Sequence, residues 1–210
     1  LIRFLMKPII FDLYSLLIQI GDLKKIQKLT FPDKRKKSDA DISIRHNLSE
    51  LKSKVITTTR RVEKAYQIAT LPWRDVSNEK ILIIGCRNVI ELKQAAFFGF
   101  KWKNIYGADL FSTNKKIICT NMENMHQIEN ETFDIVTLVN TLVYSRKPDM
   151  VLSEINRILK PKGKLIFNHS FHIKGKAIKS RYSNEMLPDL FHLTNQKLDA
   201  IIKKSNFEIY

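Results

Sequence analysis

The sequence predicts an α/β fold, with a mostly parallel β-sheet, helices on both faces of the sheet and a helical extension at the N-terminus. The first observation is the unbroken aliphatic run Ile81–Ile84, which is typical of a strand buried on both faces. The second is that apolar residues recur at helical spacing over 89–100, before another apolar run at 104–108. The third is the repetition of this order downstream, where residues 132–138 and 149–160 are predicted to form a strand and a helix.

Glycine and acidic residues stand where the first two strands end. Gly85 follows the first strand and turns the chain toward the helix at 89–100, whose end Gly99 can cap. Asp109 follows the second strand, where a carboxylate can accept hydrogen bonds from the two hydroxyls of a ribose. These residues predict a nucleotide-sized pocket at the carboxyl ends of the strands. The alternative is that Gly85 only ends a strand and Asp109 only begins a turn.

The downstream half adds a third and a fourth strand. Residues 132–138 are predicted to be the third core strand, and 149–160 place their apolar residues on one helical face. Pro161 and Gly163 are predicted to end this helix and turn the chain. The fourth strand then begins at 164–167.

From 79 to 168 the chain resembles the class I S-adenosylmethionine-dependent methyltransferases, and within them the type 11 group. The resemblance rests on five motifs in the family's order: the first strand and turn at 81–86, the acidic motif at 107–110, the adenine loop at 121–125, the fourth-strand motif at 133–136, and the helix and turn at 151–167. The last of these is the most specific. The resemblance implies a Rossmann-like fold, S-adenosyl-L-methionine as cofactor and a methyltransferase activity.

The resemblance also implies which residues bind the cofactor. The backbone near Gly85 and Cys86 would face the methionine part, Asp109 would hold the ribose, and Leu110 would pack on the adenine.

Three further positions follow from the same resemblance. Asn121 stands where many relatives have an aspartate that accepts a hydrogen bond from the adenine amino group, and its amide oxygen can accept the same bond without charge. Met122 would supply a backbone donor to the adenine ring. Asn140, just past the fourth strand of the family's order, would face the reactive sulfonium region.

The first motif departs from the family's pattern. Relatives have three alternating glycines after the first strand, because close backbone approach to the cofactor leaves no room for side chains. This chain has Gly85, Arg87 and Val89 at those positions, and Ile83 where an acidic residue is usual. Arg87 is predicted to pair with the cofactor carboxylate, with Glu91 near its amino group. The alternative is that Arg87 faces solvent and the site has lost cofactor binding.

The sequence identifies no catalytic residue and no metal ligand set. Methyl transfer can proceed by proximity and alignment alone, although a hydroxyl acceptor would benefit from a general base. His169, His172 and Tyr144 follow predicted strands and are candidates, but histidines at such places are more often structural. Cys86 and Cys119 are predicted to be buried apolar residues, with no disulfide and no zinc site.

Composition limits the partners. The net charge of +15 comes from lysine-rich segments such as 24–37 and 160–179. A basic surface favours anionic partners, but a general lysine bias on solvated faces is the preferred explanation. A nucleic-acid partner is not expected, because the aromatic residues Phe97, Phe98, Phe100 and Trp102 are predicted to be core. Two cysteines favour a reducing compartment, and we expect a cytoplasmic protein.

Two segments are predicted: residues 1–45 as an N-terminal helix and basic linker, with the polar linker over 31–43, and residues 46–210 as the methyltransferase-like domain. The apolar stretch within 1–20 is too short to span a bilayer, which needs about 20 apolar residues. It is expected to cover the sheet or a partner, or alternatively to make peripheral contact with a membrane. Residues 49–70 are predicted to be a helix that places Trp73 over the pocket.

At the other end of the chain, residues 206–210 are predicted to be a sixth strand, and no candidate for a seventh follows. We therefore expect a sequence truncated after the sixth strand, with an exposed edge.

The functional prediction is a methyltransferase acting on a small-molecule or glycan-type acceptor. One alternative is a non-catalytic relative that binds or scaffolds, which the altered first motif would permit. Another is a dinucleotide-dependent oxidoreductase, but no G-x-G-x-x-G pattern follows Ile84.

Overall fold

The computed structural model describes residues 38, 41–45, 47–48, 60–72, 74–87, 89–112, 114–168 and 195–208. The strands in this part of the chain are β1 (Ile81–Ile84), β2 (Ile105–Asp109), β3 (Ile117–Cys119), β4 (Phe133–Val139) and β5 (Leu159–Asn168). The helices are α3 (Arg60–Ala69), α4 (Val89–Phe97), α5 (Pro148–Ile158) and α6 (Asn195–Lys204), with the short 3₁₀ helices η1 (Trp102–Asn104) and η2 (Leu142–Tyr144).

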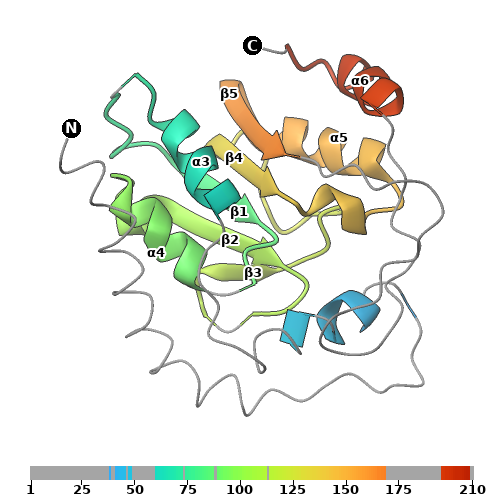
Figure 1. Ribbon diagram of the computed structural model, residues 1–210, viewed down its shortest axis with the longest axis horizontal. Helices are drawn as coiled ribbons and strands as arrows, with labels where there is room; N and C mark the ends of the chain where they lie inside the picture. Colours follow the sequence, from blue (N-terminus) through green and yellow to red (C-terminus); the bar gives the residue numbers. More distant parts are fainter. Residues whose placement is uncertain are drawn as a thin grey trace.

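The strands of the described residues form one sheet in the order β3-β2-β1-β4-β5 (Figure 1). Every pairing between neighbours is parallel. The chain builds outward from β1 through β2 to β3, and then crosses to the other side of β1 to add β4 and β5. This arrangement confirms the predicted α/β, Rossmann-like fold, and it creates a reversal of strand order between β1 and β4, where such sheets bind ligands.

The central strand β1 is aliphatic throughout because it lies between two hydrophobic cores. Ile81 and Ile83 belong to the core on one face of the sheet, whereas Leu82 and Ile84 belong to the core on the other. Successive side chains of a strand point to opposite faces, so a strand covered on both faces needs apolar residues at every position. Helices α3 and α4 contribute to the first core, and α5 and α6 contribute to the second (Figure 1).

The junction between α5 and β5 differs from the prediction. The helix ends at Ile158, and the chain enters β5 directly, so that Leu159 pairs with Phe133. The register then shifts, because the next partner pair is Ile135 with Lys164. The predicted turn at 161–163 is therefore an irregularity inside a strand. Proline cannot donate to a β-ladder, and the bulge accommodates it.

Three further predictions are corrected. Residues 41–43, predicted to be linker, are helical together with 44–45. Residues 206–208 form no strand, because Asn206 adopts a φ of 57° that turns the chain at the end of α6. The helix predicted over 89–100 ends at Phe97, and Gly99 with φ of 109° turns the chain there.

Two burial predictions are also wrong. Trp102 is 40% exposed in η1, although Phe98 and Phe100 are buried as expected. Cys119 is exposed because it ends β3, the edge strand of the sheet, whereas Cys86 is buried. The predictions for 1–20, Trp73, His169 and His172 lie outside the described residues. Within the described residues, no helix is both long enough and apolar enough to cross a membrane.

Candidate cofactor-binding site

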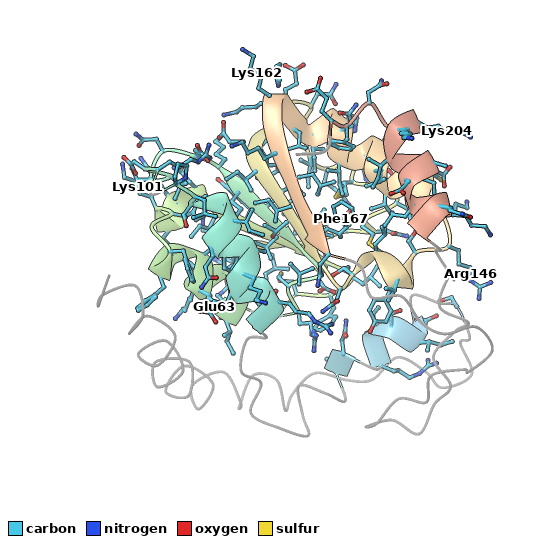
Figure 2. All side chains as sticks on the ribbon, turned by 45° about the horizontal axis from the view of Figure 1, so that its top comes forward. Glu63, Lys101, Arg146, Lys162, Phe167 and Lys204 are labelled. Carbon is cyan, nitrogen blue, oxygen red and sulfur yellow. The ribbon has the colours of Figure 1, made fainter. Side chains whose placement is uncertain are left out.

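A cavity of about 350 Å³ opens at the carboxyl ends of β1, β2 and β4. The register brings these ends together, since Ile84 pairs with Ala108 of β2 on one side and with Leu138 of β4 on the other. The loop after β4 closes part of the rim, and its Arg146 side chain is directed outward (Figure 2). The cavity therefore lies at the reversal of strand order.

Asp109 is the acidic group at the end of β2, and its side chain lines the cavity although the residue is only 7% exposed. Its Oδ2 accepts a hydrogen bond from the backbone N–H of Arg87 at 2.9 Å, and its Oδ1 accepts one from the N–H of Leu110 at 2.7 Å. Burial raises the pKa of Asp109 above its ordinary value, while these hydrogen bonds and the Arg87 charge act in the opposite direction. Asp109 thus ties the turn after β1 to the end of β2.

Two residues in the turn after β1 have a left-handed backbone conformation. Gly85 has φ of 75°, and a Cβ placed on it would lie 2.3 Å from Thr141 Oγ1. Only glycine fits this position without displacing Thr141. Arg87 has φ of 51°, a conformation that costs a non-glycine residue on the order of 1–3 kcal/mol. The backbone therefore follows the path of a glycine-rich turn even where the glycine is absent.

Glu91 lies in the first turn of α4 and lines the same cavity. Its backbone carbonyl accepts a hydrogen bond from the buried Tyr66 hydroxyl of α3 at 3.0 Å. Burial raises the pKa of the Glu91 carboxyl to about 7; the nearby Arg87 lowers it and the Asp109 charge raises it. A carboxyl group that titrates near neutral pH thus stands beside Asp109.

The predicted adenine end lies after β3. Asn121 and Met122 line the cavity, and the Asn121 side-chain oxygen accepts a hydrogen bond from the Glu123 N–H at 2.9 Å. The Glu123 carboxylate in turn accepts one from the Ser145 hydroxyl at 2.7 Å. One lone pair of the Asn121 oxygen is therefore used within the loop, which leaves the other for a ligand donor.

Asn140 lines the cavity at the end of β4 and adopts φ of 53°. Its N–H donates to the side-chain oxygen of Asn168 at 2.8 Å, and its own side-chain oxygen accepts from Arg61 Nη1 at 3.0 Å. Residues from β5 and α3 thus hold Asn140 in place.

Seven of the eight residues predicted to bind the cofactor line the cavity: Gly85, Arg87, Asp109, Leu110, Asn121, Met122 and Asn140. The eighth, Cys86, does not. The Cys86 side chain instead points into the core, where its sulfur lies 2.6 Å from the position a Cβ on Gly107 would take. The role predicted for Cys86 was for its backbone, and it stays a prediction.

Several lining residues were not found from the sequence. Thr141 sits against Gly85, Thr120 follows β3, and Ser43 reaches the cavity from the N-terminal helical residues. No local pattern marks them, because only the folded sheet brings them to one place. Among the residues that the structure describes, no group of three or more His, Cys, Asp or Glu side chains could hold a metal ion.

Comparisons with known proteins agree with this geometry. Residues 82–167 match the type 11 family model, described as a methyltransferase domain. The sequence has no significant match among curated proteins.

Solved structures with the same arrangement include a candidate methyltransferase from Bacillus halodurans, with TM-score 0.54 and 18% identity, covering 72% of this chain and 71% of that one. A candidate S-adenosylmethionine-dependent methyltransferase from Listeria monocytogenes has TM-score 0.50 and 20% identity, covering 72% and 86%. The [4+2]-cyclase SpnF has TM-score 0.51 and 17% identity, covering 70% and 57%.

At these identities the structural likeness shows the fold alone, and the family model adds the type of domain. The match begins inside β1 and ends inside β5, so it contains the strands whose carboxyl ends form the cavity. The match covers less than half of the 210-residue chain, so residues 82–167 are similar to the type 11 methyltransferase domain over the strands that form the cavity.

Proposed function

We propose that this protein is a methyltransferase that binds S-adenosylmethionine in the cavity between β1, β2 and β4 and methylates a small-molecule or glycan-type acceptor. The observation that carries the proposal is the Asp109 carboxylate, which lines the cavity at the end of β2 within the residues that match the methyltransferase domain. This is where a carboxylate can accept hydrogen bonds from both hydroxyls of a ribose.

The residues present fit the cofactor. The Asp109 carboxylate accepts the N–H groups of Arg87 and Leu110, and the Phe111 N–H also acts on it. A carboxylate has about four acceptor sites, so it can still accept a ribose hydroxyl. The partly buried Leu110 and Met122 supply apolar surface for the adenine ring. The volume of about 350 Å³ lies in the range of small-molecule sites, roughly 300–1,000 Å³.

When bound, S-adenosylmethionine supplies a methyl group activated on a sulfonium, and its transfer is a displacement that needs no covalent nucleophile. The work of the chain is then to orient the acceptor and exclude water. Asn140, held by Asn168 and Arg61, fixes the end of β4 at this part of the cavity. Tyr144 also lines it, as a candidate to contact the acceptor.

The rim suits an acceptor that carries negative charge. Arg146 and Lys147 line the cavity from the loop after β4. Cations at the entrance attract anionic molecules and orient them before they bind. A phosphorylated small molecule or sugar is the acceptor class that this rim favours.

A non-catalytic binding role is the second candidate. Arg87 occupies a glycine position of the first motif with a left-handed backbone, which is the departure a site that had lost its cofactor would tolerate. The fold also serves other reactions, since one neighbour is named a [4+2]-cyclase.

The test is to incubate the purified chain with methyl-labelled S-adenosylmethionine and panels of phosphorylated metabolites and glycans. We expect label in at least one acceptor, and binding of S-adenosylhomocysteine by calorimetry. Binding without transfer to any acceptor would favour the non-catalytic role. Absence of binding in a folded sample would reject the proposal.

A further inference from the structure

We propose that the ion pair of Glu154 and Arg157 in α5 positions the loop after β3, so that Asn121 of this loop can select the base of the cofactor. Neither member of the pair lines the cavity, so both act on the ligand only through the loop. The inference rests on the proposed function, because it concerns how the same cavity recognises one part of the same ligand.

The loop between β3 and β4 has little regular structure of its own. Over residues 120–132 it contains turns and a single isolated bridge, between Asn121 and Asn124. A side chain recognises a ligand precisely only where the surrounding groups hold it in one position. The hydrogen bonds that hold this loop therefore decide how well Asn121 can select a ligand.

Met125 is the point at which the loop is attached to α5. Its N–H donates to Glu154 Oε2 at 2.6 Å, and its carbonyl accepts a hydrogen bond from Arg157 Nη2 at 3.1 Å. Its side chain is fully buried in the core to which α5 contributes. The ion pair thus binds both backbone groups of one loop residue and fixes its position against the helix.

The Arg157 guanidinium uses all three of its nitrogens in this arrangement. Nη1 donates to the Ile128 carbonyl and to the Asn130 side-chain oxygen, each at 2.8 Å. Nε and Nη2 donate to the two Glu154 oxygens, each at 2.9 Å, so the pair is bidentate. The hydrogen bond from Arg157 lowers the pKa of Glu154, which keeps the pair ionised at neutral pH. With Met125, the planar set of five donors is fully used.

The position of Met125 determines that of Asn121 through a tight turn. The N–H of Asn124 donates to the Asn121 carbonyl at 2.9 Å, and the Thr120 hydroxyl donates to the Asn124 carbonyl at 3.1 Å. The Asn121 side-chain oxygen accepts the N–H of Glu123 at 2.9 Å. Because Met125 directly follows this turn, releasing it from α5 would displace the Asn121 amide in the cavity.

An ion pair can also hold a loop for stability alone, and the chain offers a matched pair for comparison. Lys160 Nζ lies 2.8 Å from Asp134 Oδ1, and both side chains are partly exposed, as those of Glu154 and Arg157 are. Asp134 stands at the amino end of β4, whereas the cavity opens at the carboxyl end. Loss of the Lys160 pair can lower stability, but it leaves the loop after β3 attached.

The experiment compares two ligands that differ only in the purine. S-adenosylhomocysteine offers an amino group to the Asn121 oxygen, whereas S-inosylhomocysteine has a ring carbonyl there, which would place two acceptors face to face. Calorimetry is done on the wild-type chain, on Arg157→Lys and Glu154→Gln, and on the control Lys160→Gln. Arg157→Lys keeps the charge but replaces the planar set of five donors by three.

We expect wild type to bind S-adenosylhomocysteine more tightly than S-inosylhomocysteine by about tenfold or more. In Arg157→Lys and in Glu154→Gln this affinity ratio should fall by about threefold or more, through weaker binding of S-adenosylhomocysteine. Lys160→Gln should leave the ratio unchanged even if it lowers the urea midpoint. A role in stability alone would not change the ratio.

Three results would overturn the inference while the proposed function stands: equal binding of the two ligands by wild type, an unchanged ratio in both variants, or the same fall in Lys160→Gln. If a folded wild type binds neither ligand, the proposed function fails and the inference fails with it. Circular dichroism spectra and urea unfolding verify that each variant is folded. If one of the two α5 variants does not fold, the other decides.

Discussion

Asp109 is buried and Glu91 is partly buried, and the two carboxyl groups have different local partners. Asp109 accepts backbone hydrogen bonds through both oxygens, whereas the Glu91 carboxylate accepts none from the described residues. Burial raises the pKa of both groups, and hydrogen bonds counteract this only for Asp109. Asp109 is thus suited to hold neutral hydroxyls, and Glu91 is suited to receive a cation.

At Asp109, replacement by Asn should weaken S-adenosylhomocysteine binding by about tenfold or more, since an amide nitrogen would replace one acceptor. That nitrogen would also face a backbone N–H, so we expect a loss of about 1–3 kcal/mol in unfolding free energy. Calorimetry and urea unfolding measure the two effects. Asp75→Asn, at an exposed aspartate, is the matched control. Unchanged affinity in Asp109→Asn would place the ribose elsewhere.

The raised pKa of Glu91 predicts that the free energy of unfolding depends on pH. Its folded pKa of about 7 exceeds the unfolded value of about 4.3, so the folded state holds the proton more tightly. The stability that this provides is fully present below pH 4.3 and is lost as pH rises to about 7. Glu91→Gln should remove this part of the pH dependence of urea unfolding.

The affinity for S-adenosylhomocysteine should change with pH in the opposite direction to the stability. An ammonium group needs an ionised Glu91, so S-adenosylhomocysteine affinity should fall below about pH 7, with proton release on binding. Asp109 and Arg87 are the charged groups that act on Glu91, and Asp109 titrates as well. Calorimetry in buffers of different ionisation enthalpy measures the released proton. The same proton release in Glu91→Gln would assign it to another group.

At the scale of elements, the turn between β1 and α4 depends on Gly85 and Thr141. A Cβ on Gly85 would meet Thr141 side-chain atoms at 2.3 and 2.5 Å. Thr141 is itself fixed, because its hydroxyl lies 3.0 Å from the carbonyl of Val139 and 3.3 Å from that of Ile84. The turn and the loop after β4 therefore pack as one unit.

Gly85→Ala should lower the unfolding free energy by about 1–3 kcal/mol or more, through both the positive φ and the contact with Thr141. Gly99→Ala is the matched control, since φ is also positive there but the nearest atom lies 3.7 Å from the added Cβ. Urea unfolding should show a smaller loss for Gly99→Ala. Equal losses would mean that the contact with Thr141 costs nothing.

Some elements of the fold and of the site could be predicted from the sequence, and others could not. The strands β1, β2 and β4 were predictable because burial on both faces demands apolar runs, and Asp109 was predictable from its place after β2. The bulge in β5 was not, because it depends on pairing with β4, which is distant in sequence. Thr141 and Ser43 join the site only through tertiary packing, which no local pattern records.

For the whole molecule, cofactor binding should stabilise the fold. A ligand at 100 times its Kd that binds only the native state adds about 2.7 kcal/mol, which raises the Tm of a chain of this size by roughly 5–10 °C. S-adenosylhomocysteine should produce this shift in a thermal melt, and NAD should not. A comparable shift with NAD would favour the oxidoreductase alternative.

The central claim is that the cavity at the ends of β1, β2 and β4 holds the cofactor. A crystal structure of the chain with S-adenosylhomocysteine tests it most directly. We expect both ribose hydroxyls within hydrogen-bond distance of the Asp109 carboxylate, and the amino-acid end between Arg87 and Glu91. A ligand bound outside this cavity, or with its ribose directed away from Asp109, would contradict the claim.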